Sequence, residues 1–348
     1  MPQLPRDPRS IHVSATAPPA APTQQPPVVA PETRTRRRRR RWPWVVTALL
    51  LVLALPASLL AISAWSAWSG VERAELSEVM SGSASGTNYL IVGTDSRDGV
   101  DPDTENAGAI FGEGVAGERT DTIAILRVDG GEVSLLAIPR DLYVPLATGG
   151  TNRINAAFAF GGAEALVRTI QSQLGIGIDH YLQVDLAGFL GLVDSLGGVT
   201  IDFPYPAFDP ASGLAVDTAG PNVLDGSDAL AYVRSRRYTE IIDGRSVTDP
   251  TSDLGRVQRQ QQFLGAVMAE LGATRNPFAL VSAMRSVADH VVVDDTMGLR
   301  DAARLGLSVR GAQPITATIP VANSTSPEGA SVLVFTAESE AVLAQFRG

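Results

Sequence analysis

The sequence predicts an α/β (α+β) fold, a three-layer α-β-α domain with a central mixed sheet, preceded by one transmembrane helix. Short apolar runs typical of buried strands alternate with longer amphipathic stretches typical of helices from residue 88 onward. An uncharged apolar segment over residues 43–64 comes before them. Hydrophobic residues make up 45% of the 348 residues, which is ample for a packed core.

The first 41 residues predict a disordered cytoplasmic tail. Residues 1–33 are rich in Pro, Ala, Thr and Gln and cannot bury enough apolar surface to fold. The tail holds nine arginines and two acidic residues, which give it a net charge of +7. Because the whole chain carries −9, the residues after the tail carry −16. Because such an acidic body repels phosphate backbones, we expect no nucleic-acid partner. Any anion it binds must be held by a local arginine cluster.

Residues 43–64 predict the transmembrane helix. At a rise of about 1.5 Å per residue they can cross the ~30 Å hydrocarbon core of a bilayer. Trp42 and Trp44 flank one end, and Trp65 and Trp68 flank the other, as interfacial aromatic residues do. A signal peptide is the alternative, but its apolar core is shorter and closer to the start. The preceding arginines predict a single-pass protein of the cell membrane, with a cytoplasmic N-terminus and an extracytoplasmic C-terminal domain.

A polar stalk over residues 65–87 leads to the predicted catalytic domain, residues 88–348. Asp129-Gly130-Gly131 predicts a hairpin turn between two strands, and the acidic, glycine-rich residues 98–118 predict a mobile loop. A helix over residues 155–174 is expected to be interrupted at Gly161-Gly162. The predicted strands cover residues 89–92, 122–128, 132–138, 180–184, 199–203, 291–293 and 315–319, and the other helices cover 186–196, the region of 230–233, and 253–271.

Three predicted strands carry charged residues at their ends, namely Asp95, Asp121 and Arg140. If these strands are neighbours in one sheet, the three side chains meet at one edge. Two carboxylates form a good pair of oxygen ligands for Mg²⁺ or Mn²⁺, and such an ion would neutralise phosphate oxygens and polarise phosphorus.

Further arginines lie close to these strand ends in the sequence. Each of these guanidinium groups could donate two parallel hydrogen bonds to phosphate oxygens. The residues are Arg97, Arg119 and the arginines of the segment Arg234-Ser235-Arg236-Arg237. For any one pair, such as Arg119 with Asp121, a structural ion pair is the alternative. The recurrence of four arginine-rich segments in an acidic chain favours a binding site.

The long predicted helix adds Arg256 and Gln260, which are four residues apart and share a face, with Arg259 beside them. The apolar residues that follow form either core or a lipid pocket. Arg153 lies at the start of another helix with the same mixture of a polar end and an apolar body. An amphiphile with a phosphate head would match both helices.

Several other chemistries are excluded by what the chain lacks. There is no cysteine, and every basic residue is arginine, so thiolate sites and lysine nucleophiles are excluded. His12, His180 and His290 have no metal-ligand spacing, and no serine lies in a Gly-x-Ser-x-Gly turn. Phosphate-binding Walker A and GxGxxG loops are also missing.

The order of the motifs GTDSR, RTDTI, IPRDLYV, RINAAF, LVDSLGGV, DGSDALAYVRSRR and DLGRVQRQQQFL resembles the LytR-CpsA-Psr family of cell-envelope proteins. The resemblance covers about residues 88–272 and is specific, because many separate motifs occur in family order. Single-pass anchoring is also typical of the family, and the arginine-only composition suits an actinobacterial member. The additional C-terminal domain common in actinobacterial members is not expected, because the chain stops at Gly348.

The resemblance implies a phosphotransferase that moves a glycopolymer from a polyprenyl-pyrophosphate carrier onto peptidoglycan at the membrane. Asp95 and Asp121 would then hold Mg²⁺ (or Mn²⁺), and these two residues and Arg140 are the candidate catalytic residues. The residues that the resemblance assigns to the pyrophosphate are Arg119, Arg140, Arg153, Arg234, Arg236, Arg256 and Gln260. Two alternatives remain open, a polyprenyl-pyrophosphate phosphatase with the same site and a non-catalytic regulatory protein or transcriptional attenuator of the envelope.

Overall fold

The computed structural model describes residues 58–96, 120–251, 253–274, 276–312 and 314–347, which belong to one compact unit. The predicted tail, the loop 98–118 and residues 43–57 of the predicted span lie outside these ranges. Residues 58–69 are helical. Among the described residues, no helix combines the length and the apolar character needed to cross a membrane.

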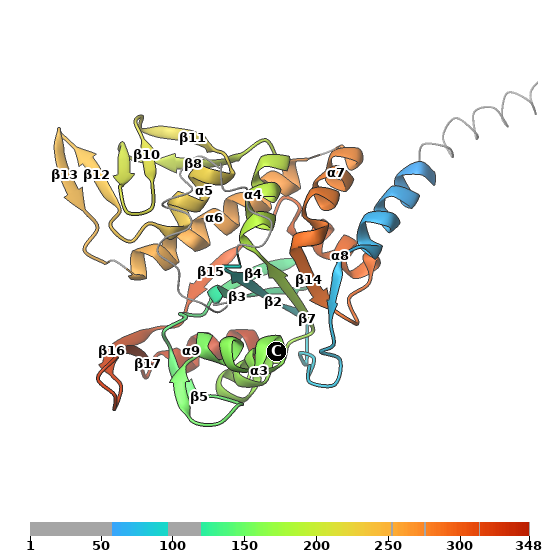
Figure 1. Cartoon of the computed structure of the whole chain (residues 1–348), viewed down its shortest axis with the longest axis horizontal. Helices are drawn as coiled ribbons and strands as arrows, with labels where there is room; N and C mark the ends of the chain where they lie inside the picture. Colours follow the sequence, from blue (N-terminus) through green and yellow to red (C-terminus); the bar gives the residue numbers. More distant parts are fainter. Residues whose placement is uncertain (1–57, 97–119, 252, 275, 313, 348) are drawn as a thin grey trace, which may run out of the picture. The chain divides into compact units, whose positions relative to one another are not determined.

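A mixed sheet lies at the centre of the described residues (Figure 1). Neighbours pair in parallel at β1–β14, β7–β2 and β4–β15 and antiparallel at the other three positions. The mixed sheet is therefore confirmed. In spatial order its strands are β1 (Glu72–Ala74), β14 (Val291–Asp294), β7 (His180–Val184), β2 (Thr87–Thr94), β3 (Thr120–Asp129), β4 (Glu132–Ala137) and β15 (Ile315–Thr318).

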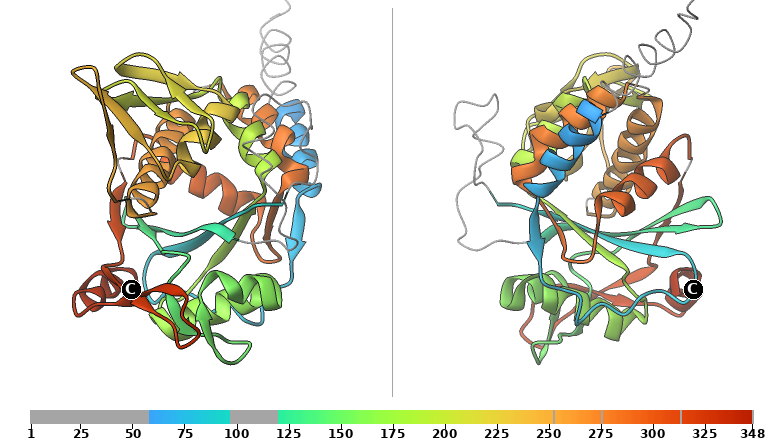
Figure 2. Two further views of the ribbon diagram at one scale, coloured as in Figure 1. Left: turned by 60° about the vertical axis from the view of Figure 1, so that its left-hand side comes forward. Right: turned by 90° about the vertical axis from the view of Figure 1, so that its right-hand side faces the viewer.

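Helices cover both faces of this sheet, as Figures 1 and 2 show. Side chains on one face, including Leu90 and Ile125, are buried against α3 (Asn155–Leu174) and α9 (Ser339–Arg347). The alternate side chains, such as Tyr89 and Leu126, face α6 (Asp253–Ala273), α7 (Pro277–Val287) and α8 (Leu299–Val309). Successive strand residues point to opposite faces, so strands covered on both sides read as nearly continuous apolar runs.

Glycines produce the predicted turn and the predicted helix break. Gly130 and Gly131, between β3 and β4, have φ values of 57° and 94°. Positive φ at both central residues is what a tight hairpin turn requires. Gly162 interrupts α3 with φ 63° and ψ −157°, a conformation essentially restricted to glycine.

The elements from α4 to β13 form a region with its own core, to which α6 also contributes side chains. Phe203, Leu214, Tyr232 and Phe263 are buried there. The sequence predicted β8, α4 and the helix that is α5, but not the other strands. The elements are α4 (Leu186–Ser195), β8 (Val199–Phe203), β9 (Ala207–Asp209), β10 (Leu214–Val216), β11 (Gly220–Leu224), α5 (Gly226–Arg234), β12 (Thr239–Ile242) and β13 (Arg245–Thr248).

The folded part of the described chain begins earlier than Asn88, where we expected it. Within the predicted stalk, β1 pairs in parallel with β14, and Leu76 is only 2% exposed. Trp68, expected at a membrane interface, is buried in the same cluster as Tyr89. The sequence did not predict these elements, because the stalk is polar in composition. A three-residue edge strand and the two buried side chains Trp68 and Leu76 are too few to produce a periodic apolar pattern.

The chain after the long helix returns to the central domain. A hairpin formed by β16 (Val321–Thr325) and β17 (Ser331–Phe335) lies against the segment that follows β4, where the Leu333 N–H donates to the Asp141 carbonyl over 3.0 Å. That segment contains a second short hairpin, formed by β5 (Tyr143–Pro145) and β6 (Thr151–Arg153). The C-terminal residues therefore hold the chain next to Arg140.

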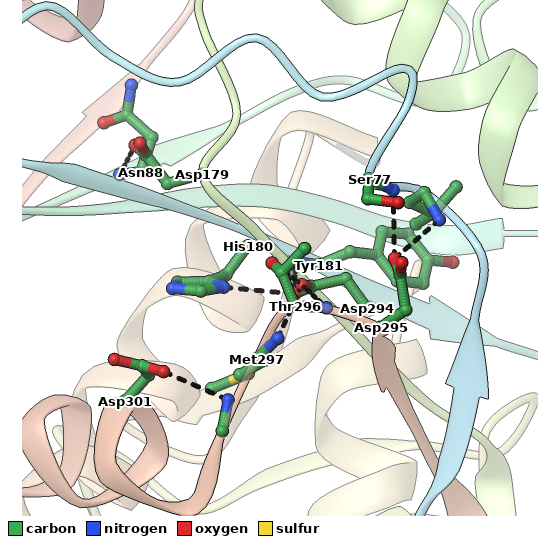
Figure 3. Close-up of polar contacts among 12 residues, drawn as sticks. Ser77, Asn88, Asp179, His180, Tyr181, Asp294, Asp295, Thr296, Met297 and Asp301 are labelled. Carbon is green, nitrogen blue, oxygen red and sulfur yellow. Dashed lines mark hydrogen bonds and ion pairs between the residues drawn. The ribbon is translucent and has the colours of Figure 1, made fainter.

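An ion pair between the half-buried His180 and the buried Asp294 joins β7 to β14 (Figure 3). His180 Nδ1 lies 3.2 Å from Asp294 Oδ2, and the His180 ring stacks on Tyr89. The fully buried Asp294 carboxylate also accepts the backbone N–H groups of Tyr181 and Met297, over 3.0 and 2.8 Å. Burial opposes the charge of His180, but its hydrogen bond to Asp294 and the nearby acidic charges outweigh this and raise the pKa of His180.

We predict that this pair makes stability depend on pH. The pKa of His180 is raised above its ordinary 6.5, so its stabilisation is complete below pH 6.5 and is lost as the pH rises through the folded value. In urea unfolding, the excess stability of the unsubstituted chain over His180→Phe, which keeps a ring against Tyr89, should shrink as the pH rises above about 6.5. Parallel pH profiles would contradict this.

A companion variant tests the other partner of the pair. Removing one charge of a buried pair costs about 3 kcal/mol, so Asp294→Asn should lower the free energy of unfolding by about that amount. The exposed Asp289 is a matched control, and Asp289→Asn should leave both the stability and its pH dependence unchanged.

Candidate functional site

The register of the central sheet brings the predicted strand ends to one edge. Thr94 at the end of β2 pairs with Thr120 at the start of β3, and Gly93 pairs with Thr122. Asp121 is therefore the extra residue of a β-bulge, the kind of irregularity that redirects the chain near functional sites. Asp95 follows Thr94 directly, so the backbone places the two aspartates at the same corner of the sheet.

Two buried hydroxyls lie at this corner. Thr94 is 6% exposed and Thr120 is fully buried, and neither Oγ1 has a hydrogen-bond partner among the described residues. The side chain of Asp121, and Arg119 as a whole, lie outside what the structure describes. Within the described part, no three acidic or histidine side chains gather as metal ligands.

A cavity of about 370 Å³ lies beside this corner, and most of the residues that line it are apolar. Its apolar walls come from α4, α5 and α6 and from the ends of β2 and β7, and they include Phe189, Leu230, Val233, Phe263 and Val267. Polar side chains interrupt these walls, and four of them are predicted site residues: Arg234, Arg236, Arg256 and Gln260. A cavity with apolar walls and clustered guanidinium groups matches an amphiphile with an anionic head.

Arg140 adjoins the same residues from the other side. With Arg256, Gln260 and Thr122 it lines a small neighbouring cavity of about 20 Å³. Backbone pairing explains the position of Arg140. The Ile138 N–H donates to the Ile123 carbonyl over 2.9 Å, so the chain stays paired with β3 beyond the end of β4 and reaches Arg140 two residues later. The structure therefore brings five of the predicted residues together around Arg256 and Gln260.

Arg153 lies apart from both cavities. Its Nε is 3.3 Å from Asp141 Oδ1, and its Nη2 donates to the Ser331 carbonyl over 2.8 Å. Asp141 Oδ2 in turn lies 3.5 Å from Arg140 Nε. Arg153 and Arg140 therefore share the Asp141 carboxylate as their ion-pair partner.

A buried aspartate that the sequence analysis missed fixes the segment Ser235-Arg236-Arg237. The Asp209 carboxylate accepts hydrogen bonds from the Ser235 hydroxyl and from the backbone N–H groups of Arg236 and Arg237, over 2.7, 3.0 and 2.8 Å. The sequence did contain one signal for it. Asp209 opens an Asp-Pro-Ala-Ser-Gly turn, and its side chain accepts the Ala211 N–H in the manner of an Asx turn.

Arg259 holds the same segment from α6. Its Nη2 donates to the Ser235 carbonyl over 2.8 Å, and its Nη1 lies 3.0 Å from Asp249 Oδ2. The guanidinium also lies 4.7 Å from the centroid of the Tyr238 ring. Burial raises the pKa of Tyr238 to about 12, so this phenol stays neutral and is no base at physiological pH.

Asp185 is a second residue that the sequence analysis missed. It lines the larger cavity, and its Oδ1 accepts the Gly188 N–H to cap α4. Its Oδ2 lies 3.0 Å from His290 Nδ1. His290, expected to be an ordinary surface or core residue, thus orients a carboxylate in the cavity wall.

Residues 64–345 match the model of the LytR_cpsA_psr family. The chain is 35% identical over 268 residues to the probable cell wall biosynthesis protein LcpB of Corynebacterium glutamicum, covering 75% of this chain and 61% of that protein. It is 36% identical over 186 residues to the polyisoprenyl-teichoic acid–peptidoglycan teichoic acid transferase TagU of Halalkalibacterium halodurans, covering 53% and 52%. The chain therefore spans about half to three-fifths of the length of these relatives.

A solved structure shares the fold. The LytR-Csp2A-Psr enzyme from Actinomyces oris superimposes with a TM-score of 0.63 and 29% sequence identity, covering 79% of this chain and 96% of that one.

We predict that the arginines of the larger cavity bind a prenyl pyrophosphate. A hydrogen bond to a charged group contributes about 1.5–3 kcal/mol, so Arg236→Ala and Arg256→Ala should each weaken the binding of farnesyl diphosphate about 10- to 100-fold. Titration calorimetry on the full-length chain in detergent measures this. Arg168→Ala, whose arginine pairs with Glu164 on α3, is the control, and an equal loss in that variant would contradict a local effect.

Proposed function

Because this chain belongs to the LytR-CpsA-Psr family, we propose that it is a phosphotransferase that moves a glycopolymer from a polyprenyl-pyrophosphate carrier onto peptidoglycan. The observation that carries the proposal is the larger cavity, where apolar walls meet Arg234, Arg236, Arg256 and Gln260. The named activity of the TagU relative supports the same reaction class. The substrates themselves are part of the proposal.

In the proposed reaction, a peptidoglycan hydroxyl attacks the phosphorus nearest the glycopolymer. The new bond joins the acceptor oxygen to this phosphorus and the bond to the bridging oxygen breaks. Polyprenyl phosphate leaves with the electron pair of that bond, and the hydroxyl proton passes to solvent. Phosphoryl transfer of this kind depends on positioning and on neutralising charge. Arg234, Arg236 and Arg256 would bind the pyrophosphate oxygens, and Arg140 would bind them from the side of β4. The apolar walls would hold the prenyl chain and fix its direction.

We also propose that Asp95 and Asp121 hold Mg²⁺ or Mn²⁺. The fit rests on the donor set at the bulge, where the backbone places both aspartates next to the buried hydroxyls of Thr94 and Thr120. All of these donors are oxygen atoms, which hard dications prefer. When bound, the ion would supply positive charge to the phosphate oxygens.

The proposed location follows from the charge pattern of the sequence. Residues 43–64 would anchor the chain in the cell membrane, with residues 1–41 in the cytoplasm and the described domain outside. This arrangement would place the cavity on the side of the membrane where both the lipid carrier and peptidoglycan are accessible. The membrane, the lipid-linked glycopolymer and peptidoglycan are thus the proposed partners.

A complementation experiment tests the function. In a strain that lacks this protein and its paralogues, the unsubstituted chain should restore covalent attachment of glycopolymer to peptidoglycan, measured on purified walls. Arg140→Ala should reduce attachment at least about 100-fold, because it removes a positive charge that would stabilise the negative charge of the transition state. Arg168→Ala should restore attachment fully, and a chelator of divalent cations should abolish it in isolated membranes.

Each outcome separates the alternatives. Phosphate release without a covalent polymer–peptidoglycan product would indicate the phosphatase. Normal attachment with altered transcription in the deletion strain would indicate the regulatory protein. Full attachment by Arg140→Ala would contradict the proposed site.

A further inference from the structure

We infer that Asp209 is a positioning residue for the proposed reaction, and that its buried carboxylate sets the orientation of Arg234 and Arg236 in the cavity. The inference rests on the proposed function, because it assigns these two arginines to the pyrophosphate. Asp209 lies at the end of β9, far in sequence from the arginines, and does not line either of the two cavities described above.

The geometry of the segment explains how one carboxylate can position two side chains. The Ser235 side chain turns inward to Asp209, over 2.7 Å, whereas Arg234 and Arg236 on either side of it line the cavity. Ser235 is fully buried and ends α5 with φ −58° and ψ 122°, which is no longer helical. The chain leaves the helix at Ser235, and the bonds to Asp209 determine the direction it takes.

The backbone donors make the arrangement specific for an ionised carboxylate. Asp209 accepts from three backbone N–H groups, those of Ala211, Arg236 and Arg237, over 2.9, 3.0 and 2.8 Å. Burial alone would raise the pKa of Asp209, but the hydrogen bonds from Ser235 and from these N–H groups outweigh it and leave the pKa lowered. The Ser235, Arg236 and Arg237 groups donate to Oδ2 and the Ala211 N–H donates to Oδ1. An asparagine therefore leaves at least one donor facing its NH₂ group, and it also removes the negative charge that the remaining donors stabilise.

The opposite side of the segment is held by a separate contact. Arg259 Nη2 donates to the Ser235 carbonyl over 2.8 Å, and Arg259 is itself fixed by Asp249. Ser235 is thus bound through its hydroxyl from β9 and through its carbonyl from α6. Contacts from β9 and α6 therefore fix the backbone from which the Arg234 and Arg236 side chains extend. A fixed backbone reduces the conformational entropy that these side chains lose when they bind an anion.

A double-mutant cycle on farnesyl diphosphate binding by the full-length chain tests the inference. Asp209→Asn should weaken binding about tenfold in the unsubstituted background. In an Arg236→Ala background the same change should cost about threefold or less, because the part of its effect that passes through Arg236 is then absent and only the part through Arg234 remains. In an Arg140→Ala background, where the arginine lies outside the segment, the tenfold loss should persist.

Matched variants keep the result interpretable. Asp202→Asn, at an exposed position of β8, should leave binding unchanged. Ser235→Ala removes a single bond to Asp209 and should give a smaller loss, about threefold, with the same dependence on Arg236, so it serves where Asp209→Asn folds poorly.

A loss of equal size in both arginine backgrounds would overturn the inference, since that result indicates a general structural defect. Undiminished binding by Asp209→Asn and Ser235→Ala would overturn the inference alone and leave the proposed function standing. Failure of the unsubstituted chain to bind farnesyl diphosphate would overturn both.

Discussion

Burying guanidinium charge beside an apolar cavity is the constraint on which the rest of this site depends. Arg256 and Arg259 are only 6% and 7% exposed on α6, and a buried charge is costly unless it is paired or hydrogen-bonded. Arginine meets this demand better than other cations, since its planar group can satisfy several acceptors at once. Asp249 pairs with Arg259. Arg259 also donates to the Ser235 carbonyl, while the buried Asp209 accepts the Ser235 hydroxyl.

The central sheet determines where this charge gathers. Antiparallel pairing of β2 with β3 and of β3 with β4, together with parallel pairing of β2 with β7, directs four strand ends to one edge. Asp95, Asp121, Arg140 and Asp185 are the residues at those ends. The long α6 then crosses this edge with Arg256 and Gln260, which line both cavities. A pyrophosphate would complete this pattern of charge.

The sequence predicts those parts of the fold that depend on local pattern. Apolar runs predicted the strands of the sheet other than β1, Gly130-Gly131 predicted the hairpin, and Gly161-Gly162 predicted the break in α3. The spacing of Arg256 and Gln260 correctly placed them on one face, since helical periodicity is a local property. The density of arginines singled out the segment 234–237, and the family motifs selected Arg234 and Arg236 within it.

Long-range contacts could not be predicted in this way. Asp209 acts on a segment 26 residues away, Ser235 being its nearest partner there, and the three-residue strand β9 leaves no periodic signal. The pairing of β1 with β14 joins residues more than 200 positions apart, so the polar stalk concealed it. Arg153 was assigned to the pyrophosphate by resemblance, whereas its contacts with Asp141 and Ser331 depend on a C-terminal hairpin whose docking no motif announced.

We propose that the larger cavity holds a prenyl chain, with its phosphate head at the arginines. Mass spectrometry of lipid retained by the full-length protein, purified from membranes in mild detergent, tests it most directly. We predict that a polyprenyl phosphate or pyrophosphate is bound to the unsubstituted chain and is strongly depleted in a variant that carries both Arg236→Ala and Arg256→Ala. Retention of only neutral lipids, or equal retention of prenyl phosphate by the double variant, would contradict it.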